Sequence, residues 1–293
     1  MATSSSTAAL DQWFLENSAR GCTPEQLRTS MLEAGYQEEF ANAYLRQRHP
    51  RDAVNPGDPV HHRAEVPDTP ALRAWWQRAD ELAGSNQVHL GDRVAQIIGR
   101  HAHNGVYYLR NILSHEECDA IIRLASARIE ASTVVDPHSG ESVPDSRRTS
   151  KGTFLAARAS PVTSTLESRL ALLSGLPEKH GEGLQILHYR EGGEYQPHFD
   201  YFDPLVAGST RQLARGGQRL VTIIVYLNEV RCGGGTTFPS LGLEFLPEKG
   251  AALMFASLTR DGGLQPQSLH GGAPVTAGEK WIATRWIRVR PFA

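Results

Sequence analysis

The hydrophobic pattern of this chain changes its period once, near Gly183. Before that point apolar residues recur at three- and four-residue spacing, which is typical of amphipathic helices. After it come four short segments rich in β-branched and aromatic residues and separated by glycine and proline: Leu184–Arg190, Arg219–Leu227, Ala251–Phe255 and Trp281–Val289. Short strands with no helical pattern between them favour an antiparallel sandwich or barrel. The sequence therefore predicts an α+β fold, with helices first and a β-sandwich after them.

Start and stop signals define three helices in the middle of the chain. Pro70 opens the first, the Ser114–Glu117 capping box opens the second, and Pro161 opens the third, which is expected to end near Gly175. These helices are predicted to support the β-rich core.

The first 48 residues are expected to form a small unit of three helices. Leu27, Met31 and Ala34 make the apolar stripe of its second helix, which stops at Gly35. The flanking helices carry the apolar residues Leu10, Trp13, Phe14, Phe40, Ala41, Tyr44 and Leu45. The unit carries no pattern typical of chemistry, so we expect it to bind a protein partner.

Proline is concentrated between residues 49 and 70, which hold five prolines and few apolar residues. Such a segment extends the chain and blocks helix and sheet, which is typical of a linker. We therefore divide the chain into a helical module at 1–48, a linker at 49–70, a helical and mixed region at 71–183 and a β-rich core at 184–293.

Composition limits which binding partners and which cellular compartment we expect for this protein. A formal net charge of -2 with 21% charged residues gives no reason to expect a nucleic acid or a membrane surface as partner. The cysteines, Cys22, Cys118 and Cys232, are far apart and odd in number, which favours a reducing compartment. There is neither a secretory pattern at the start nor an apolar run of roughly 20 residues. We expect a soluble, cytoplasmic protein.

The pattern that points to chemistry is His198-Phe199-Asp200. On a strand, residues two apart project from the same face, so this imidazole and carboxylate suit two adjacent corners of an octahedral metal. Two histidines and one carboxylate leave three positions open, as in non-haem Fe(II) oxygenases. A His-x-Asp pair alone also fits a surface ion pair. His270, in the β-rich part, is the candidate for the third ligand.

Lys280 begins the last apolar segment. If that segment is a strand, Lys280, Ile282, Thr284 and Trp286 share one mostly apolar face directed at the core. A buried ammonium requires an anionic partner. The partner is either an aspartate or glutamate of the chain, or a dicarboxylic acid bound deep in the barrel. Trp286 is either a core residue or a wall of an active-site mouth.

From about Val106 to the C-terminus, roughly two-thirds of its length, the chain resembles the collagen-type and algal-type prolyl 4-hydroxylases. Beyond the ligand pattern, the resemblance rests on an ordered series of motifs: Gly216–Arg219, Tyr226–Asn228, Gly233–Pro239, Pro247–Phe255, and Ser268–His270 followed by Lys280. Such a series is far more specific than any one motif.

The resemblance implies a double-stranded β-helix (jelly-roll) catalytic core. It implies Fe(II) on His198, Asp200 and His270. It also implies that the C5 carboxylate of 2-oxoglutarate pairs with Lys280 and that two further side chains add hydrogen bonds to this cosubstrate, Tyr189 and Thr236.

On the substrate side, the resemblance implies that Arg219, Tyr195 and Trp286 line a peptide site. Strand parity sets Tyr195 on the face opposite His198, unless Pro197 introduces a bulge. The polar segment 136–148 corresponds to a loop that covers the substrate in the family.

The implied activity is 4-hydroxylation of peptidyl proline, coupled to conversion of 2-oxoglutarate and O₂ into succinate and CO₂, with ascorbate as reductant. Two alternatives stay open. The same site can serve another residue or a small metabolite, or the jelly roll can be a catalytically silent binding module. A nucleic-acid demethylase fits less well, because that branch typically has arginine where Lys280 stands and this chain has no basic excess.

Overall fold

The computed structural model describes residues 24–36, 68–135, 142–144, 148–206 and 208–292, together with Leu10, Trp13, Phe14, Asn17, Glu38, Ala41, Tyr44 and Leu45. The chain divides into two compact units, Met1–His62 and Arg63–Ala293. Most of the expected linker at 49–70 lies outside the described residues, so the domain boundaries stay a prediction.

In the N-terminal unit, α2 spans Pro24–Glu33. Its Leu27 and Met31 are buried with the apolar residues Leu10, Phe14, Ala41, Tyr44 and Leu45. The predicted stripe is wrong at Ala34, which is exposed. The reason is that α2 ends before it, and Gly35 turns the chain with a φ of +86°. Phe40 lies outside the described residues.

The second unit is built mainly of antiparallel strands. In chain order these are β1 (Gln87–His89), β2 (Val94–His101), β3 (Val106–Arg110), β4 (Glu130–Ala131), β5 (Thr133–Val135), β6 (Ser142–Pro144), β7 (Lys151–Leu155), β8 (Leu184–Tyr189), β9 (Tyr195–His198), β10 (Arg219–Tyr226), β11 (Cys232–Gly233), β12 (Thr236–Phe238), β13 (Leu243–Phe245), β14 (Ala252–Ala256), β15 (His270–Gly272), β16 (Val275–Ala277) and β17 (Lys280–Arg288). A large sheet has the order β1-β2-β3-β14-β10-β17-β8-β7-β4, and a small sheet has the order β13-β12-β15-β9. Two short pairs, β11–β16 and β5–β6, complete the unit.

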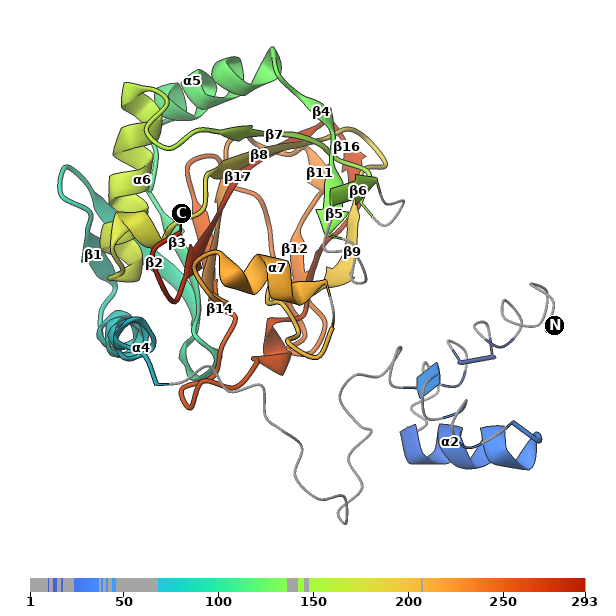
Figure 1. Cartoon of the computed structure of the whole chain (residues 1–293). Helices are drawn as coiled ribbons and strands as arrows, with labels where there is room; N and C mark the ends of the chain where they lie inside the picture. Colours follow the sequence, from blue (N-terminus) through green and yellow to red (C-terminus); the bar gives the residue numbers. More distant parts are fainter. Residues whose placement is uncertain are drawn as a thin grey trace. The chain divides into compact units, whose positions relative to one another are not determined.

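From β8 onward the chain passes back and forth between the two sheets, with β8, β10, β14 and β17 in the large sheet and β9, β12, β13 and β15 in the small one. This alternation is the topology of a double-stranded β-helix, so the predicted jelly-roll core is confirmed. Figure 1 shows the two groups of strands on opposite sides of the barrel.

Three helices lie against the outer face of the large sheet: α4 (Pro70–Ala83), α5 (His115–Ser126) and α6 (Pro161–Ser174) (Figure 1). The predicted caps are present, with the reciprocal Ser114–Glu117 hydrogen bonds at α5 and Gly175 ending α6 at a φ of +68°. Apolar residues of these helices pack on the outward residues of β8, β10 and β17 as one cluster. The other helical segments are α7 (Ser209–Ala214) and the 3₁₀ turns η1 (Ala102–Asn104), η2 (Glu178–His180) and η3 (Pro266–Ser268). No helix in the described part of the chain is long and apolar enough to cross a bilayer.

The expectation of helices first and strands afterwards is wrong for residues 87–155. Five strands from this region, β1, β2, β3, β4 and β7, extend the large sheet at both ends. Four of them, β1, β2, β4 and β7, carry mixed sequences because they are partly exposed; along β2, buried or half-buried residues alternate with exposed ones. β3 buries residues on both faces, but its apolar run is too short to be told from a helix segment.

Candidate active site

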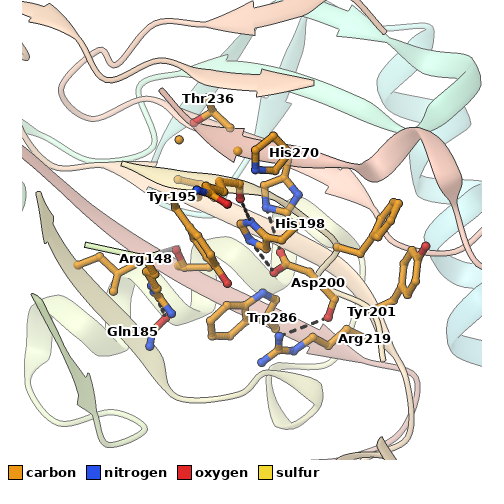
Figure 2. Close-up of a pocket in the computed structure, with 18 of the residues that line it drawn as sticks. Arg148, Gln185, Tyr195, His198, Asp200, Tyr201, Arg219, Thr236, His270 and Trp286 are labelled. Carbon is orange, nitrogen blue, oxygen red and sulfur yellow. Dashed lines mark hydrogen bonds and ion pairs between the residues drawn. The ribbon is translucent and has the colours of Figure 1, made fainter. Parts of the chain in front are cut away.

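A cavity of about 410 Å³ opens between the two sheets. The inward side chains of β8, β10 and β17 line it on one side, and β9, β12 and β15 line it on the other. Figure 2 shows these side chains converging from both sheets on His198, Asp200 and His270.

The three expected metal ligands lie together in the cavity. Their ligand atoms are all within 4.8 Å of one another, and no other such cluster of histidine, cysteine or carboxylate side chains is found among the described residues. Nε2 of His198 lies 3.7 Å from Oδ1 of Asp200, and Nε2 of His270 lies 3.5 Å from Oδ2 of the same carboxylate. His198 and His270 face each other because β9 and β15 pair in register there.

The ring of each histidine is oriented by the backbone carbonyl of the residue two positions before it. Nδ1 of His198 lies 2.9 Å from the carbonyl oxygen of Gln196, and Nδ1 of His270 lies 2.9 Å from that of Ser268. A carbonyl only accepts, so each Nδ1 carries the proton and each Nε2 presents its lone pair to the cavity. Burial and the adjacent His270 lower the pKa of His198 far below its usual range, so that ring is neutral and able to bind a metal at neutral pH.

Asp200 is oriented by Thr222 on β10, whose hydroxyl donates to Oδ2 at 2.7 Å. Burial alone would raise the pKa of Asp200, but His270, His198, Arg219 and the Thr222 hydrogen bond together lower it below its usual range. The site thus offers two imidazole nitrogens and one carboxylate, each side chain with an outer hydrogen-bond partner. This donor set fits a divalent metal with three positions left open.

Lys280 occupies the inner end of the cavity, on the inward face of β17 that strand parity predicted. Its side chain is 3% exposed, and Nζ lies 5.6 and 5.7 Å from the ring centroids of Tyr189 and Tyr226. No ion pair joins Lys280 to any carboxylate in the described part of the chain. Burial therefore lowers the pKa of Lys280 to about 8, against a weaker raising effect of the exposed Glu244. An internal partner is thus excluded for the described residues, and the ammonium faces the cavity.

The two side chains expected to assist Lys280 line the same end. Tyr189 pairs with Lys280 across β8 and β17, and the Thr236 hydroxyl accepts a hydrogen bond from the Tyr226 hydroxyl at 2.8 Å. Gly272 lies opposite, where an added Cβ would be 3.9 Å from Nζ. Together they leave a polar end suited to a small anion.

Tyr195 reaches the cavity through a bulge. Opposite His270–Gly272, β9 carries one residue more than β15, so that Gly272 pairs with Tyr195 and His270 with His198. The extra residue at Gln196–Pro197 brings Tyr195 to the side of His198, where the two rings stack at 3.6 Å between centroids. The bulge considered from the sequence is therefore present.

Arg219 and Trp286 stack at the cavity mouth, with the guanidinium carbon 3.8 Å from the ring centroid. Nε and Nη2 of Arg219 donate to both carboxylate oxygens of Glu182, at 2.7 and 3.0 Å. Nη1 is 3.3 Å from the backbone oxygen of Asp200. The indole N–H of Trp286 is buried and has no hydrogen-bond acceptor among the described residues. Both residues lie where a substrate would enter (Figure 2).

The structure adds residues that the sequence did not indicate. Arg148 is buried at the mouth, donates to Oε1 of Gln185 at 3.0 Å and lies over the Tyr195 ring at 4.9 Å (Figure 2). Gln185 could have been predicted from the sequence as a cavity residue, because it lies four residues before Tyr189 and therefore on the same face of the strand. Arg148 could not have been predicted, because no periodic pattern surrounds it. The covering loop expected at 136–148 lies outside the described residues apart from 142–144 and Arg148.

Comparison with known proteins agrees with this geometry. The family profile described as the 2OG-Fe(II) oxygenase superfamily matches residues 184–288, the span that holds the three candidate ligands and Lys280. Fold, site and match define the class of the protein as a 2OG-Fe(II) oxygenase. This class implies Fe(II) and 2-oxoglutarate; the three ligand side chains fit the metal, and the buried Lys280 fits a dicarboxylate.

Individual relatives narrow the class. The chain is 42% identical over 205 residues to probable prolyl 4-hydroxylase 7 of Arabidopsis thaliana, which covers 64% of this chain and 63% of that protein. It is 39% identical over 243 residues to probable prolyl 4-hydroxylase 10 of the same plant, and this match covers 76% of this chain and 80% of that protein. A solved viral collagen prolyl hydroxylase from Paramecium Bursaria Chlorella virus-1 aligns at 28% identity with a TM-score of 0.49, covering 62% of this chain and 95% of that one. The 39% identity to prolyl 4-hydroxylase 10, over 80% of that protein, shows that the chain belongs to the prolyl 4-hydroxylase family.

Proposed function

We propose that this protein hydroxylates C4 of proline within peptides, using Fe(II), O₂ and 2-oxoglutarate. The observation that carries the proposal is the pairing of two features in one cavity. A triad with the donor set of a non-haem iron site lines it, together with a buried lysine that has no ion-pair partner among the described residues.

His198, Asp200 and His270 hold Fe(II), which when bound supplies the site at which 2-oxoglutarate and O₂ react. Lys280 binds the far carboxylate of 2-oxoglutarate, and Tyr189 and Thr236 add hydrogen bonds. One oxygen atom of O₂ enters succinate and the other replaces hydrogen at the target carbon as hydroxyl. 2-Oxoglutarate loses CO₂ and provides two of the four electrons that reduce O₂, and the C–H bond of the target carbon provides the other two. The protein orients these groups and keeps water away from them.

The peptide enters where Tyr195, Trp286 and Arg219 meet. The two aromatic side chains offer flat surfaces for a pyrrolidine ring. Arg219 is held by Glu182 through Nε and Nη2 and by the Asp200 backbone oxygen through Nη1, so the second N–H of Nη1 or Nη2 is what it can offer to a peptide carbonyl. An extended polyproline-type peptide suits this mouth because it loses little conformational entropy on binding. The relatives named as prolyl 4-hydroxylases favour proline as the target.

Three further parts belong to the proposal. Ascorbate serves as the reductant that maintains Fe(II). The protein acts in the cytoplasm, for which the free cysteines Cys118 and Cys232 are supporting evidence. The N-terminal helical unit binds a protein partner.

A catalytically silent jelly roll is the alternative from another class. It gives no reason for a charged Lys280 in the interior, which lowers stability unless an anion binds. The alternative within enzymes is that the same site hydroxylates a small metabolite. Identifying the substrate distinguishes this alternative from peptide hydroxylation.

The test compares free L-proline with a short proline-rich peptide in the presence of Fe(II), 2-oxoglutarate and ascorbate. Peptide fragmentation locates the added oxygen, and amino-acid analysis against 4-hydroxyproline identifies the carbon. We expect 4-hydroxyproline in the peptide and little turnover of free proline, which lacks flanking residues. Oxygen on another residue, or on free proline alone, contradicts the substrate assignment. The His270→Ala variant is the matched control and should form no product.

A further inference from the structure

Phe154 is an exposed aromatic side chain at the edge of the active-site cavity. It is 58% exposed and lies on β7. Among the six large apolar side chains found exposed in the described part of the chain, Phe154 is the only one that lines the cavity. Single exposed apolar residues are common and need no explanation. The evidence that Phe154 has a function is therefore its position relative to the active site.

The strand register places Phe154 in a row that crosses the cavity. Phe154 pairs with Gln185 on β8, and Gln185 pairs with Thr284 on β17. All three side chains line the cavity. Trp286, two residues beyond Thr284 on the same face of β17, pairs with Thr222, the residue that holds Asp200. The target ring therefore belongs above β17, and Phe154 lies two strands away from it.

The separation is compatible with one turn of an extended proline-rich peptide. Neighbouring strands are about 4.8 Å apart and residues along a strand about 3.3 Å, so the backbones at Phe154 and Trp286, two strands and two residues apart, are separated by about 12 Å. Both side chains project into the same cavity, so their rings lie closer together than their backbones. A polyproline II helix rises about 3.1 Å per residue and repeats every three residues, which gives about 9.3 Å per turn, and residues three apart point to the same side of it. A peptide that crosses the strands obliquely thus presents the target residue at Trp286 and the third residue away from it at Phe154.

We propose that Phe154 is a specificity-determining subsite that binds the ring of a second proline, three residues from the target. The proposal rests on the proposed function, because it presupposes a peptide substrate. The subsite is continuous with the active-site cavity, and aromatic surfaces are the usual binding partners of proline rings in extended peptides. Gly152 on the same strand supports the arrangement. A Cβ there would approach Cδ2 of Leu187 to 2.7 Å, so glycine lets β7 lie close against β8.

The test uses three peptides with one target proline: one with a second proline three residues before it, one with it three residues after, and one with alanine at both positions. KM and kcat are measured for the wild type and for Phe154→Ala, Phe154→Tyr and Leu246→Ala. Leu246 is 64% exposed and does not line the cavity, so its variant controls for the loss of an exposed apolar side chain. Fragmentation confirms which proline is hydroxylated.

We expect the wild type to prefer one of the two-proline peptides through a lower KM. Phe154→Ala should raise the KM for that peptide by about three- to tenfold, as for the loss of one aromatic contact. Its KM for the alanine peptide and its peptide-independent decarboxylation of 2-oxoglutarate should stay unchanged. Phe154→Tyr should restore the preference, and Leu246→Ala should behave as wild type.

Equal KM values of wild type and Phe154→Ala for all peptides overturn the subsite. So does an equal rise for all peptides, which would indicate a general effect on the cavity. If the wild type hydroxylates none of the peptides, the proposed function itself fails, and the two failures are therefore distinguishable.

Discussion

Replacing Lys280 with methionine should stabilise the free protein while removing its affinity for 2-oxoglutarate. Burial lowers the pKa of Lys280 from 10.5 to about 8, and each unit of pKa corresponds to about 1.4 kcal/mol. Holding the ammonium charged in the cavity at pH 7 therefore costs the free protein about 3 kcal/mol. Methionine has a similar length and no charge, so it removes this cost without leaving a cavity.

The dependence on pH follows from the same shift. Below pH 8 the lysine is protonated in both the folded and the unfolded chain, and the whole cost applies. Between pH 8 and 10.5 the folded chain gives up the proton first. The unfolded chain then binds more protons, so wild-type stability rises with pH relative to the variant. The stability difference should be largest at pH 7 and should largely disappear by pH 10.

Urea unfolding at pH 7 and pH 10, without 2-oxoglutarate, measures the difference. We expect Lys280→Met to be more stable by roughly 1–3 kcal/mol at pH 7. Adding 2-oxoglutarate to the Fe(II)-loaded proteins under anaerobic conditions should further stabilise only the wild type, by about 2.7 kcal/mol at 100 times Kd. Lys249→Met is the matched control, because the Lys249 ammonium already pairs with Asp119 and its loss should bring no gain. A Lys280→Met variant less stable than wild type at pH 7 would refute the reasoning.

Three further predictions follow from the site. Thr222→Val removes the hydrogen bond to Asp200 and should weaken Fe(II) binding by roughly tenfold or more in calorimetric titration; unchanged affinity would mean that Asp200 needs no such partner. The KM for 2-oxoglutarate should rise by about tenfold from pH 7 to pH 9 as Lys280 loses its proton, and a flat profile in this range would count against Lys280 as the anchor. A chain that begins at Thr69 should fold and retain peptide-independent decarboxylation, because every proposed ligand lies beyond it; insolubility of that chain would mean that the N-terminal unit is needed for folding.

The parts of the fold that the sequence predicted are those with a strong local pattern. The four apolar segments after Gly183 became β8, β10, β14 and β17, and strand parity gave the inward face of Lys280. The strands between residues 87 and 155 were missed, because most of them are partly exposed and have mixed sequences, and because the apolar run of β3 is too short to distinguish strand from helix.

The parts of the site that were missed depend on contacts between distant segments. Arg148 reaches the mouth through Gln185, 37 residues away, and Glu182 holds Arg219 at a similar separation. No local period encodes such pairs. The position of Tyr195 was predictable only in part. Strand parity alone places it on the face opposite His198, and only the register of β9 against β15 shows the bulge that brings it to the side of His198.

The most direct test is to quantify succinate and 4-hydroxyproline in one reaction containing enzyme, Fe(II), 2-oxoglutarate and a proline-rich peptide. After the succinate formed without peptide is subtracted, the two products should form in a one-to-one ratio, and neither should form with His198→Ala or His270→Ala. Hydroxyproline without succinate, or activity that survives either substitution, would contradict the assignment of this cavity as a 2-oxoglutarate-dependent prolyl hydroxylase site.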